Sequence, residues 1–245
     1  MCGRYASTKT KLQLAETFHV SADYAADGVR EDYNVAPTKT APAILSTLAK
    51  DDPAAQMVRR LEMLRWGLIP PWAKDLKIGA KMVNARAETI SDKPSYRRPF
   101  AARRCLIPLD GFYEWVEEDQ GGPKPVKQPY FLRPKDGGIL AAAGVWERWH
   151  DPDKPKDDPD AWLHSFVIII ITTDATDDVG RVHDRMPMIV LPEQWDEWLD
   201  PRLLDPNAAR ILMGPPEPGT LDIYAVSRAV NHARSNGPEL IRPLD

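Results

Sequence analysis

The sequence has only two cysteines among its 245 residues, Cys2 and Cys105. Two isolated cysteines cannot build a disulfide framework, and they are too few for a structural zinc site. Such scarcity is typical of a reducing compartment. We therefore expect a cytoplasmic protein, nucleoid-associated if it is bacterial, and we expect neither a metal nor another cofactor.

Long apolar segments are also missing. The longest apolar run covers residues 166–171, whereas a membrane-spanning helix needs about 20 apolar residues. The first residues lack the basic and then apolar pattern of a signal peptide. We expect no membrane contact and no secretory leader.

Several catalytic motifs are absent as well. The chain contains no glycine-rich phosphate loop, no C-x-x-C, no H-E-x-x-H and no G-x-S-x-G. These absences argue against P-loop, thiol-redox, zinc-protease and α/β-hydrolase chemistry. If the protein is an enzyme with a nucleophile, that nucleophile belongs to none of these four classes.

Net charge is low, at −4, but it is unevenly distributed. Residues 54–104 hold 12 Lys or Arg and four Asp or Glu, a net charge of +8, which leaves −12 for the rest. A basic segment on an acidic protein can bind a polyanion locally. The alternative is that these charges are spread over a solvated surface.

Proline is abundant, with 24 residues, and many of them interrupt short apolar runs. This pattern predicts many short strands rather than long helices. We expect strands at 41–48, 57–66, 105–108, 111–116, 130–133, 140–146, 166–172, 187–191 and 222–225, and helices near 8–19, 192–199 and 206–213. The predicted fold is one α+β domain over residues 1–245, with a curved, mainly antiparallel, barrel-like sheet and short flanking helices. Polar hairpin insertions, too polar for a core, are expected near 117–128 and 150–161.

Cys2 is the candidate nucleophile. Removal of Met1 would give it a free α-amine beside its thiol, and both groups can act as nucleophiles near neutral pH. A 1,2-aminothiol condenses with an aldehyde to give a five-membered thiazolidine. The alternative is an ordinary residue at a frayed terminus.

Four further clusters carry polar side chains that suit chemistry. Asn84 and Arg86 lie two residues apart, so an extended segment presents both on one face. Glu114 stands among aromatics in Gly-Phe-Tyr-Glu-Trp, where desolvation would raise its pKa for acid/base work. His183, which follows the segment 172–175, begins His-Asp-Arg-Met-Pro and is an acid/base candidate. The segment 33–37, Tyr-Asn-Val-Ala-Pro, has a simple turn as its alternative.

Together these motifs resemble the SOS-response-associated peptidase-like (SRAP) family, from Cys-Gly-Arg at residues 2–4 to His-x-Arg-Met-Pro at 183–187. The resemblance implies a covalent sensor of abasic sites in single-stranded DNA that forms a thiazolidine crosslink. It assigns crosslinking to Cys2, orientation of its amine and thiol to Asn84, and acid/base roles to Glu114 and His183. It also implies DNA contacts, which fall on Arg4, Arg86, Arg185, Pro37, Trp66, Trp72 and Trp115. Core packing is the alternative for Trp66 and Trp72, and we expect it for one of them.

The expected partner is therefore abasic single-stranded DNA bound by a monomer, with replication-associated proteins as further partners. Two other functions remain open. An N-terminal cysteine peptidase or amidase would use the Cys2 thiol with its own α-amine as base, and removal of the leading residue fits that activity. A non-covalent single-stranded DNA-binding module would leave Cys2 incidental.

Overall fold

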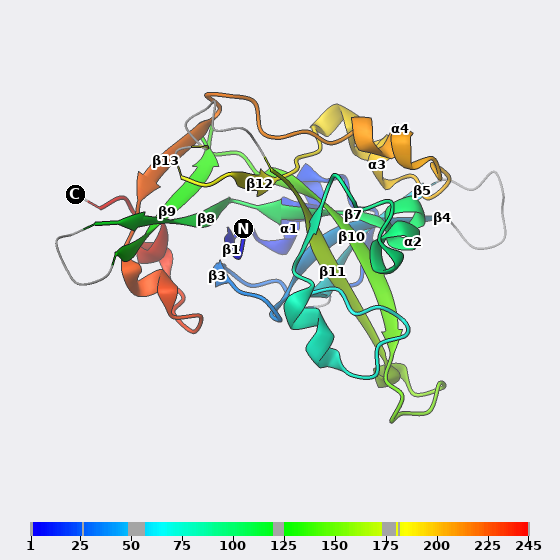
Figure 1. Ribbon diagram of the computed structural model, residues 1–245. Helices are drawn as coiled ribbons and strands as arrows, with labels where there is room; N and C mark the ends of the chain where they lie inside the picture. The colour runs from blue at the N-terminus through cyan, green and yellow to red at the C-terminus, as the bar shows by residue number, and fades with distance from the viewer. Residues whose placement is uncertain are drawn as a thin grey trace.

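The computed structural model describes residues 2–25, 27–48, 57–119, 125–172, 180 and 182–244. Strands dominate the described chain, and short helices lie around them (Figure 1). The strands are β1 (Arg4–Ser7), β2 (Ala22–Asp23), β3 (Asp32–Val35), β4 (Thr40–Leu48), β5 (Met57–Trp66), β6 (Asn84–Arg86), β7 (Arg104–Leu109), β8 (Gly111–Glu118), β9 (Val126–Pro134), β10 (Leu140–His150), β11 (Trp162–Thr172), β12 (Arg185–Pro187) and β13 (Leu221–Ala225). The α-helices are α1 (Lys11–Thr17), α2 (Pro94–Ala102), α3 (Trp195–Leu199) and α4 (Pro206–Ile211), and the 3-10 helices are η1 (Leu76–Lys81), η2 (Pro159–Ala161), η3 (Pro192–Gln194), η4 (Arg228–Asn231) and η5 (Pro238–Ile241).

The larger sheet curves until it meets itself. Its order is β12-β11-β10-β7-β4-β5-β2, and most neighbours are antiparallel. In addition, β5 pairs in parallel with β11 through Arg65–Ser165 and Trp66–Phe166. This pairing joins two strands that the main order separates and closes a ring of β11, β10, β7, β4 and β5. The predicted α+β fold with a barrel-like, mainly antiparallel sheet is confirmed.

The smaller sheet places the N-terminus inside the molecule. Its order is β13-β9-β8-β1-β3, and β1 pairs with β8 on one side and β3 on the other. The N-terminal label in Figure 1 accordingly lies near the centre of the view, beside β1 and β8. Cys2, two residues before the start of β1, has an exposed fraction of zero. The terminus at Cys2 is therefore packed and not frayed.

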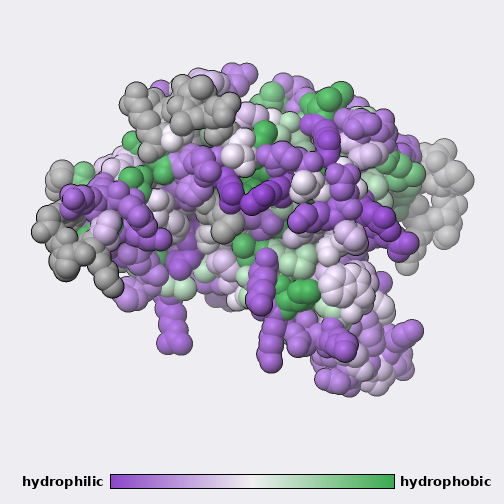
Figure 2. All heavy atoms as spheres, viewed as in Figure 1, coloured by the Kyte–Doolittle hydropathy of each residue, from purple (hydrophilic) through white to green (hydrophobic). Residues whose placement is uncertain are grey.

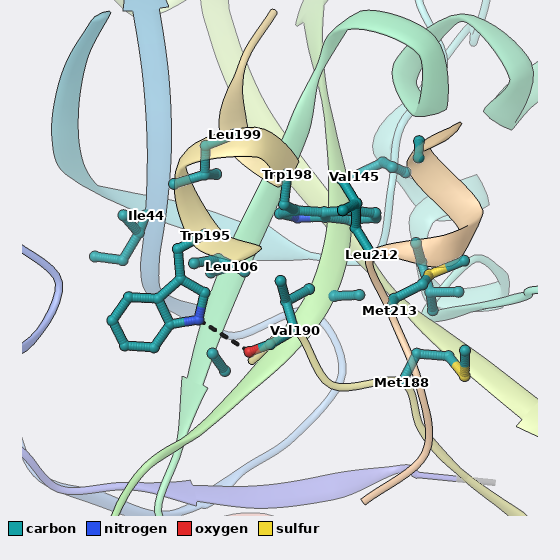
Figure 3. Close-up of a cluster of buried hydrophobic side chains, with 14 of the residues drawn as sticks. Ile44, Leu106, Val145, Met188, Val190, Trp195, Trp198, Leu199, Leu212 and Met213 are labelled. Atoms are coloured by element: carbon teal, nitrogen blue, oxygen red, sulfur yellow. Dashed lines mark hydrogen bonds between the residues drawn. The ribbon is translucent and has the colours of Figure 1, made fainter. Parts of the chain in front are cut away.

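The barrel strands bury both faces. Ile44, Leu106 and Val145 point toward α3, where Trp195 donates its indole hydrogen to the Val190 carbonyl at 2.9 Å (Figure 3). The alternate side chains of the same strands, such as Leu45 and Ile107, pack with residues of the smaller sheet. Burial on both faces explains why residues 166–171 are continuously apolar and do not alternate.

A glycine pair shapes the connection from β5 to β6. Gly67 has φ +115°, and a Cβ there would lie 2.4 Å from the Gly79 carbonyl oxygen. Only glycine fits this left-handed conformation and close approach. The contact packs the chain after Trp66 against η1, which leads directly into the strand that begins at Asn84.

Some predicted elements differ from the structure. Helix α2 was not predicted. Pro94 starts this helix at a position where its missing N–H costs nothing. The strand expected at 187–191 ends at Pro187. At the ends of the expected hairpin insertion near 117–128, the residues belong to β8 and β9, and Gln128 is buried and donates to the Val226 carbonyl at 2.8 Å. Residues 120–124 lie outside the described chain.

Candidate active site

The Asn84 side chain contacts the backbone of Cys2. Its Nδ2 donates to the Cys2 carbonyl oxygen at 2.9 Å. β6 holds Asn84 in place by pairing in parallel with β11, where Asn84 lies opposite Ile168. The Asn84 Oδ1 is buried and has no hydrogen-bond donor within the described ranges. An amide held in this way can accept a hydrogen bond from a group at the start of the chain.

The Cys2 thiol lies in an apolar environment. It belongs to a buried cluster that includes Tyr5 and Phe112. Burial raises the pKa of the thiol well above its ordinary value, and the nearby negative charge of Glu114 adds to this effect. At neutral pH the sulfur is therefore protonated and needs a base before it can act as a nucleophile.

Glu114 and His183, the two acid/base candidates, lie side by side in the structure. Glu114 has an exposed fraction of 2%, and its Oε2 lies 3.9 Å from His183 Nε2. Burial is the main cause that raises the Glu114 pKa from 4.5 to about 7; Asp184 adds to the shift and Arg185 opposes it. At neutral pH this carboxyl is therefore close to half protonated, so it can both donate and accept protons.

His183 is held on its other side. Its Nδ1 lies 3.0 Å from the Arg185 backbone nitrogen and 2.8 Å from Asp184 Oδ1. Burial lowers the pKa of His183, Arg185 contributes in the same direction, and Asp184 opposes them. When Nδ1 accepts from the Arg185 N–H, the neutral ring carries its proton on Nε2, which faces Glu114.

A cavity of about 400 Å³ opens beside this pair. It is lined by Arg4, Glu114, Trp115, Lys127, His183 and Asn231. Sequence reasoning missed Lys127 and Asn231. Lys127 could have been found from the β8–β9 hairpin register, which sets it opposite Glu117. No sequence signal marks Asn231, which comes from η4 near the other end of the chain.

Comparison with known proteins identifies the family of this chain. The sequence model of the SOS response associated peptidase (SRAP) family matches residues 1–233. The chain belongs to the SRAP family. It is 39% identical over 241 residues to the abasic site processing protein YoqW of Bacillus subtilis, which covers 98% of this chain and 99% of the relative.

More distant relatives and a solved structure extend the match. The abasic site processing protein HMCES of Pongo abelii is 34% identical to this SRAP chain over 238 residues, covering 87% of the chain and 65% of the relative. A crystal structure of a protein from Bacteroides thetaiotaomicron has a TM-score of 0.79 at 27% identity and covers 99% of this chain and 100% of its own.

The three tryptophans and one proline expected at the DNA surface of the SRAP chain separate into two groups. Trp72 has an exposed fraction of 63%, and Trp115 and Pro37 are half-buried. Trp66 is completely buried, so the expected base contact is wrong for this residue. Its ring lies 5.1 Å from Tyr5, and its Nε1 donates to the Val83 carbonyl at 2.9 Å. Trp66 thus supports the residue that precedes Asn84.

The three expected DNA-binding arginines also differ in setting. Arg86 is exposed and Arg185 is half-buried. Arg4 lines the cavity, but its guanidinium already donates to Asn34 Oδ1 and to the Val230 carbonyl, both at 2.8 Å. A phosphate at Arg4 would compete with these bonds.

Part of the basic segment serves the fold. Arg104 is buried and donates to the carbonyls of Phe100, Ala101, Trp198 and Asp200, which ties α2 to α3. Arg59 is also buried and binds the Phe18 carbonyl and Asp196. These two cations are not available to a polyanion. The positive charge that residues 54–104 can offer to a bound strand is therefore smaller than the sequence suggests. Figure 2 shows hydrophilic residues over much of the face in view.

Three further expectations concern residues outside the described ranges, a metal site and a membrane span. Met1 and residues 173–175 lie outside the described residues. No group of three or more His, Cys, Asp or Glu side chains in the described ranges is placed to hold a metal ion. Among those ranges, no helix is both long and apolar enough to cross a membrane.

Asn34 is a structural residue of the site. Its exposed fraction is zero, and its Nδ2 lies 3.0–3.2 Å from the carbonyls of Val230, His232 and Ser235. We expect Asn34→Ala to lower the free energy of unfolding by about 2–3 kcal/mol, because buried carbonyls and the Arg4 guanidinium lose their partner. Urea unfolding measures this change. Asn207→Ala, at an exposed position of α4, should change it by less than about 0.5 kcal/mol, and an equally small effect at Asn34 would contradict the expectation.

Proposed function

We propose that this SRAP protein processes abasic sites in single-stranded DNA by forming a thiazolidine crosslink through Cys2 once Met1 is removed. The convergence of Asn84 and Glu114 on Cys2, with His183 behind Glu114, is the observation that carries the proposal. The relatives named abasic site processing proteins support the choice of substrate. The buried Glu114 carboxyl and the half-buried Asn84 amide also suit reaction with an aldehyde, because both the amine and the thiol of Cys2 need proton transfer.

The proposed reaction begins at the amine. An abasic deoxyribose is in equilibrium with its open-chain aldehyde, and His183 donates a proton to the sugar oxygen as the ring opens. The unprotonated α-amine of Cys2 attacks C1′, and the carbinolamine loses one water to give an imine. The order follows from burial, since the raised pKa keeps the sulfur protonated at this stage.

Ring closure completes the adduct. Glu114, with a pKa of about 7, accepts the thiol proton, and the sulfur adds to the imine carbon. The imine nitrogen takes up a proton, so one aldehyde and one aminothiol give one thiazolidine and one water. The ring removes the imine from which strand cleavage would otherwise proceed.

The DNA strand is proposed to follow the exposed cations and rings around the cavity. Arg86 and Arg185 are suited to phosphates, and Trp72, Trp115 and Pro37 to bases. Arg4 contributes to strand binding mainly by holding η4, through its hydrogen bond to the Val230 carbonyl. Salt weakens the electrostatic attraction between the DNA strand and these cations, whereas the covalent product does not dissociate when salt is added.

The experiment is a crosslinking assay with an abasic single-stranded oligonucleotide. We expect an adduct that survives denaturing electrophoresis, with a mass equal to protein without Met1 plus DNA minus one water. A matched strand with an intact base should give none. Raising salt during encounter should slow formation, while salt added afterwards should leave the adduct intact. Tight binding to both strands without an adduct would instead indicate a non-covalent module, and turnover of peptides without DNA a peptidase.

A further inference from the structure

The segment from η4 to η5 forms one wall of the reactive cavity, although its sequence carries no recognised motif. Asn231, the last residue of η4, lines the cavity together with Glu114 and His183. This residue is more than a hundred positions from Glu114 in the sequence, so specific contacts must bring it there.

Two residues of the smaller sheet hold this wall. Asn34 Nδ2 lies within hydrogen-bond distance of the carbonyls of Val230 and His232, which flank Asn231 on either side. Arg4 donates to the Val230 carbonyl at 2.8 Å and lies 3.5 Å from the carbonyl of Asn231 itself. The backbone around Asn231 is thus fixed from both directions, and the direction of its side chain is restricted.

The Asn231 side chain is bonded to a tryptophan of the cavity. Trp115 Nε1 donates to Asn231 Oδ1 at 2.7 Å. Trp115 also packs against apolar residues. Its ring centroid lies 6.5 Å from that of Tyr113, and Val230 belongs to the same cluster. Packing and one hydrogen bond therefore set the orientation of a half-buried indole at the cavity mouth.

We infer that Asn231 is a positioning residue that fixes the Trp115 ring as a stacking platform for the base next to the abasic nucleotide. An indole held by its N–H presents a π-face without losing rotational freedom when a base arrives, and stacking on it favours the larger purine rings. Asn231 acts through Trp115 and not on the reacting atoms. The inference rests on the proposed function.

The experiment compares initial rates of adduct formation on two abasic strands. One strand has purines on both sides of the lesion. The other has tetrahydrofuran spacers there, which carry no base and cannot open to an aldehyde. We expect Asn231→Ala to slow the reaction about five- to tenfold on the purine strand, as suits the loss of one hydrogen bond, and less than twofold on the spacer strand. Asn207→Ala should change neither rate.

A double-mutant comparison tests whether Trp115 transmits the effect. In a Trp115→Phe background, Asn231→Ala should cause no further loss. An equal loss on both strands, a loss that persists without Trp115, or no loss at all would overturn the inference. Asn231→Asp keeps an acceptor for the indole, so the ratio of its two rates should equal that of the unchanged protein even if added charge slows both. Failure of the unchanged protein to form any adduct would instead contradict the proposed function.

Discussion

Replacement of Cys2 with alanine is expected to reduce the covalent adduct on abasic single-stranded DNA to the level of a protein-free control. The variant keeps an α-amine after loss of Met1, but it has no sulfur to close the ring. An imine alone is reversible and does not survive denaturation. Denaturing electrophoresis of the reaction measures the difference directly.

Two further variants make this expectation specific. Cys105→Ala removes the other cysteine, which lies fully buried in β7, and should leave the adduct yield unchanged. Cys2→Ser keeps the amine and a hydroxyl, so it should give an adduct only after borohydride reduction of the imine. A denaturation-stable product from Cys2→Ala would refute the role of Cys2. The same product from unreduced Cys2→Ser would refute closure by sulfur.

The second large effect is expected at Glu114. Glu114→Gln should slow adduct formation about 10²–10³-fold at pH 7, because the glutamine cannot accept the thiol proton. The rate of the unchanged protein should show an inflection near pH 7, where the buried carboxyl titrates. The variant should lack this inflection. Glu16→Gln, which neutralises an exposed carboxyl on α1, serves as the control.

The same carboxyl should affect stability in a defined direction. Its folded pKa of about 7 lies above the ordinary 4.5, so the folded protein retains a proton that the unfolded chain releases. Stability therefore falls as pH rises through this window, by about 3 kcal/mol in total. Glu114→Gln should remove this part of the pH dependence in urea unfolding measured from pH 4 to pH 8. An identical slope in both proteins would show that the Glu114 pKa is not raised.

The sequence contained enough information for the fold class and for several of the side chains that meet around Cys2 and His183. Short apolar runs separated by proline predicted most strands, and the two-residue spacing of Asn84 and Arg86 predicted their common side of β6. The spacing could not show that β5 meets β11, because that contact depends on how far the sheet curves. It therefore could not identify the strands that close the predicted barrel-like sheet.

Residue roles were harder to predict where one residue type serves two purposes. Trp66 and Trp72 look equivalent in the sequence, yet one fills the core beside Tyr5 and the other has an exposed fraction of 63%. Arg104 counts toward the basic segment in the sequence, but in the fold its guanidinium donates to backbone carbonyls. Asn231 gives no local pattern, since its position depends on Asn34 and Arg4, about 200 residues earlier.

The burial of the N-terminal strand between β3 and β8 has a consequence for the timing of reactivity. During synthesis Cys2 emerges first, whereas Asn84, Glu114, His183 and Asn231 follow much later. Pairings over such sequence distances form slowly, because the chain must close large loops before the contacts become favourable. A nascent or unfolded chain consequently carries an aminothiol without its proton-transfer partners. Completion of folding would thus act as the step that activates the protein, and it would restrict crosslinking to molecules that have reached the native state.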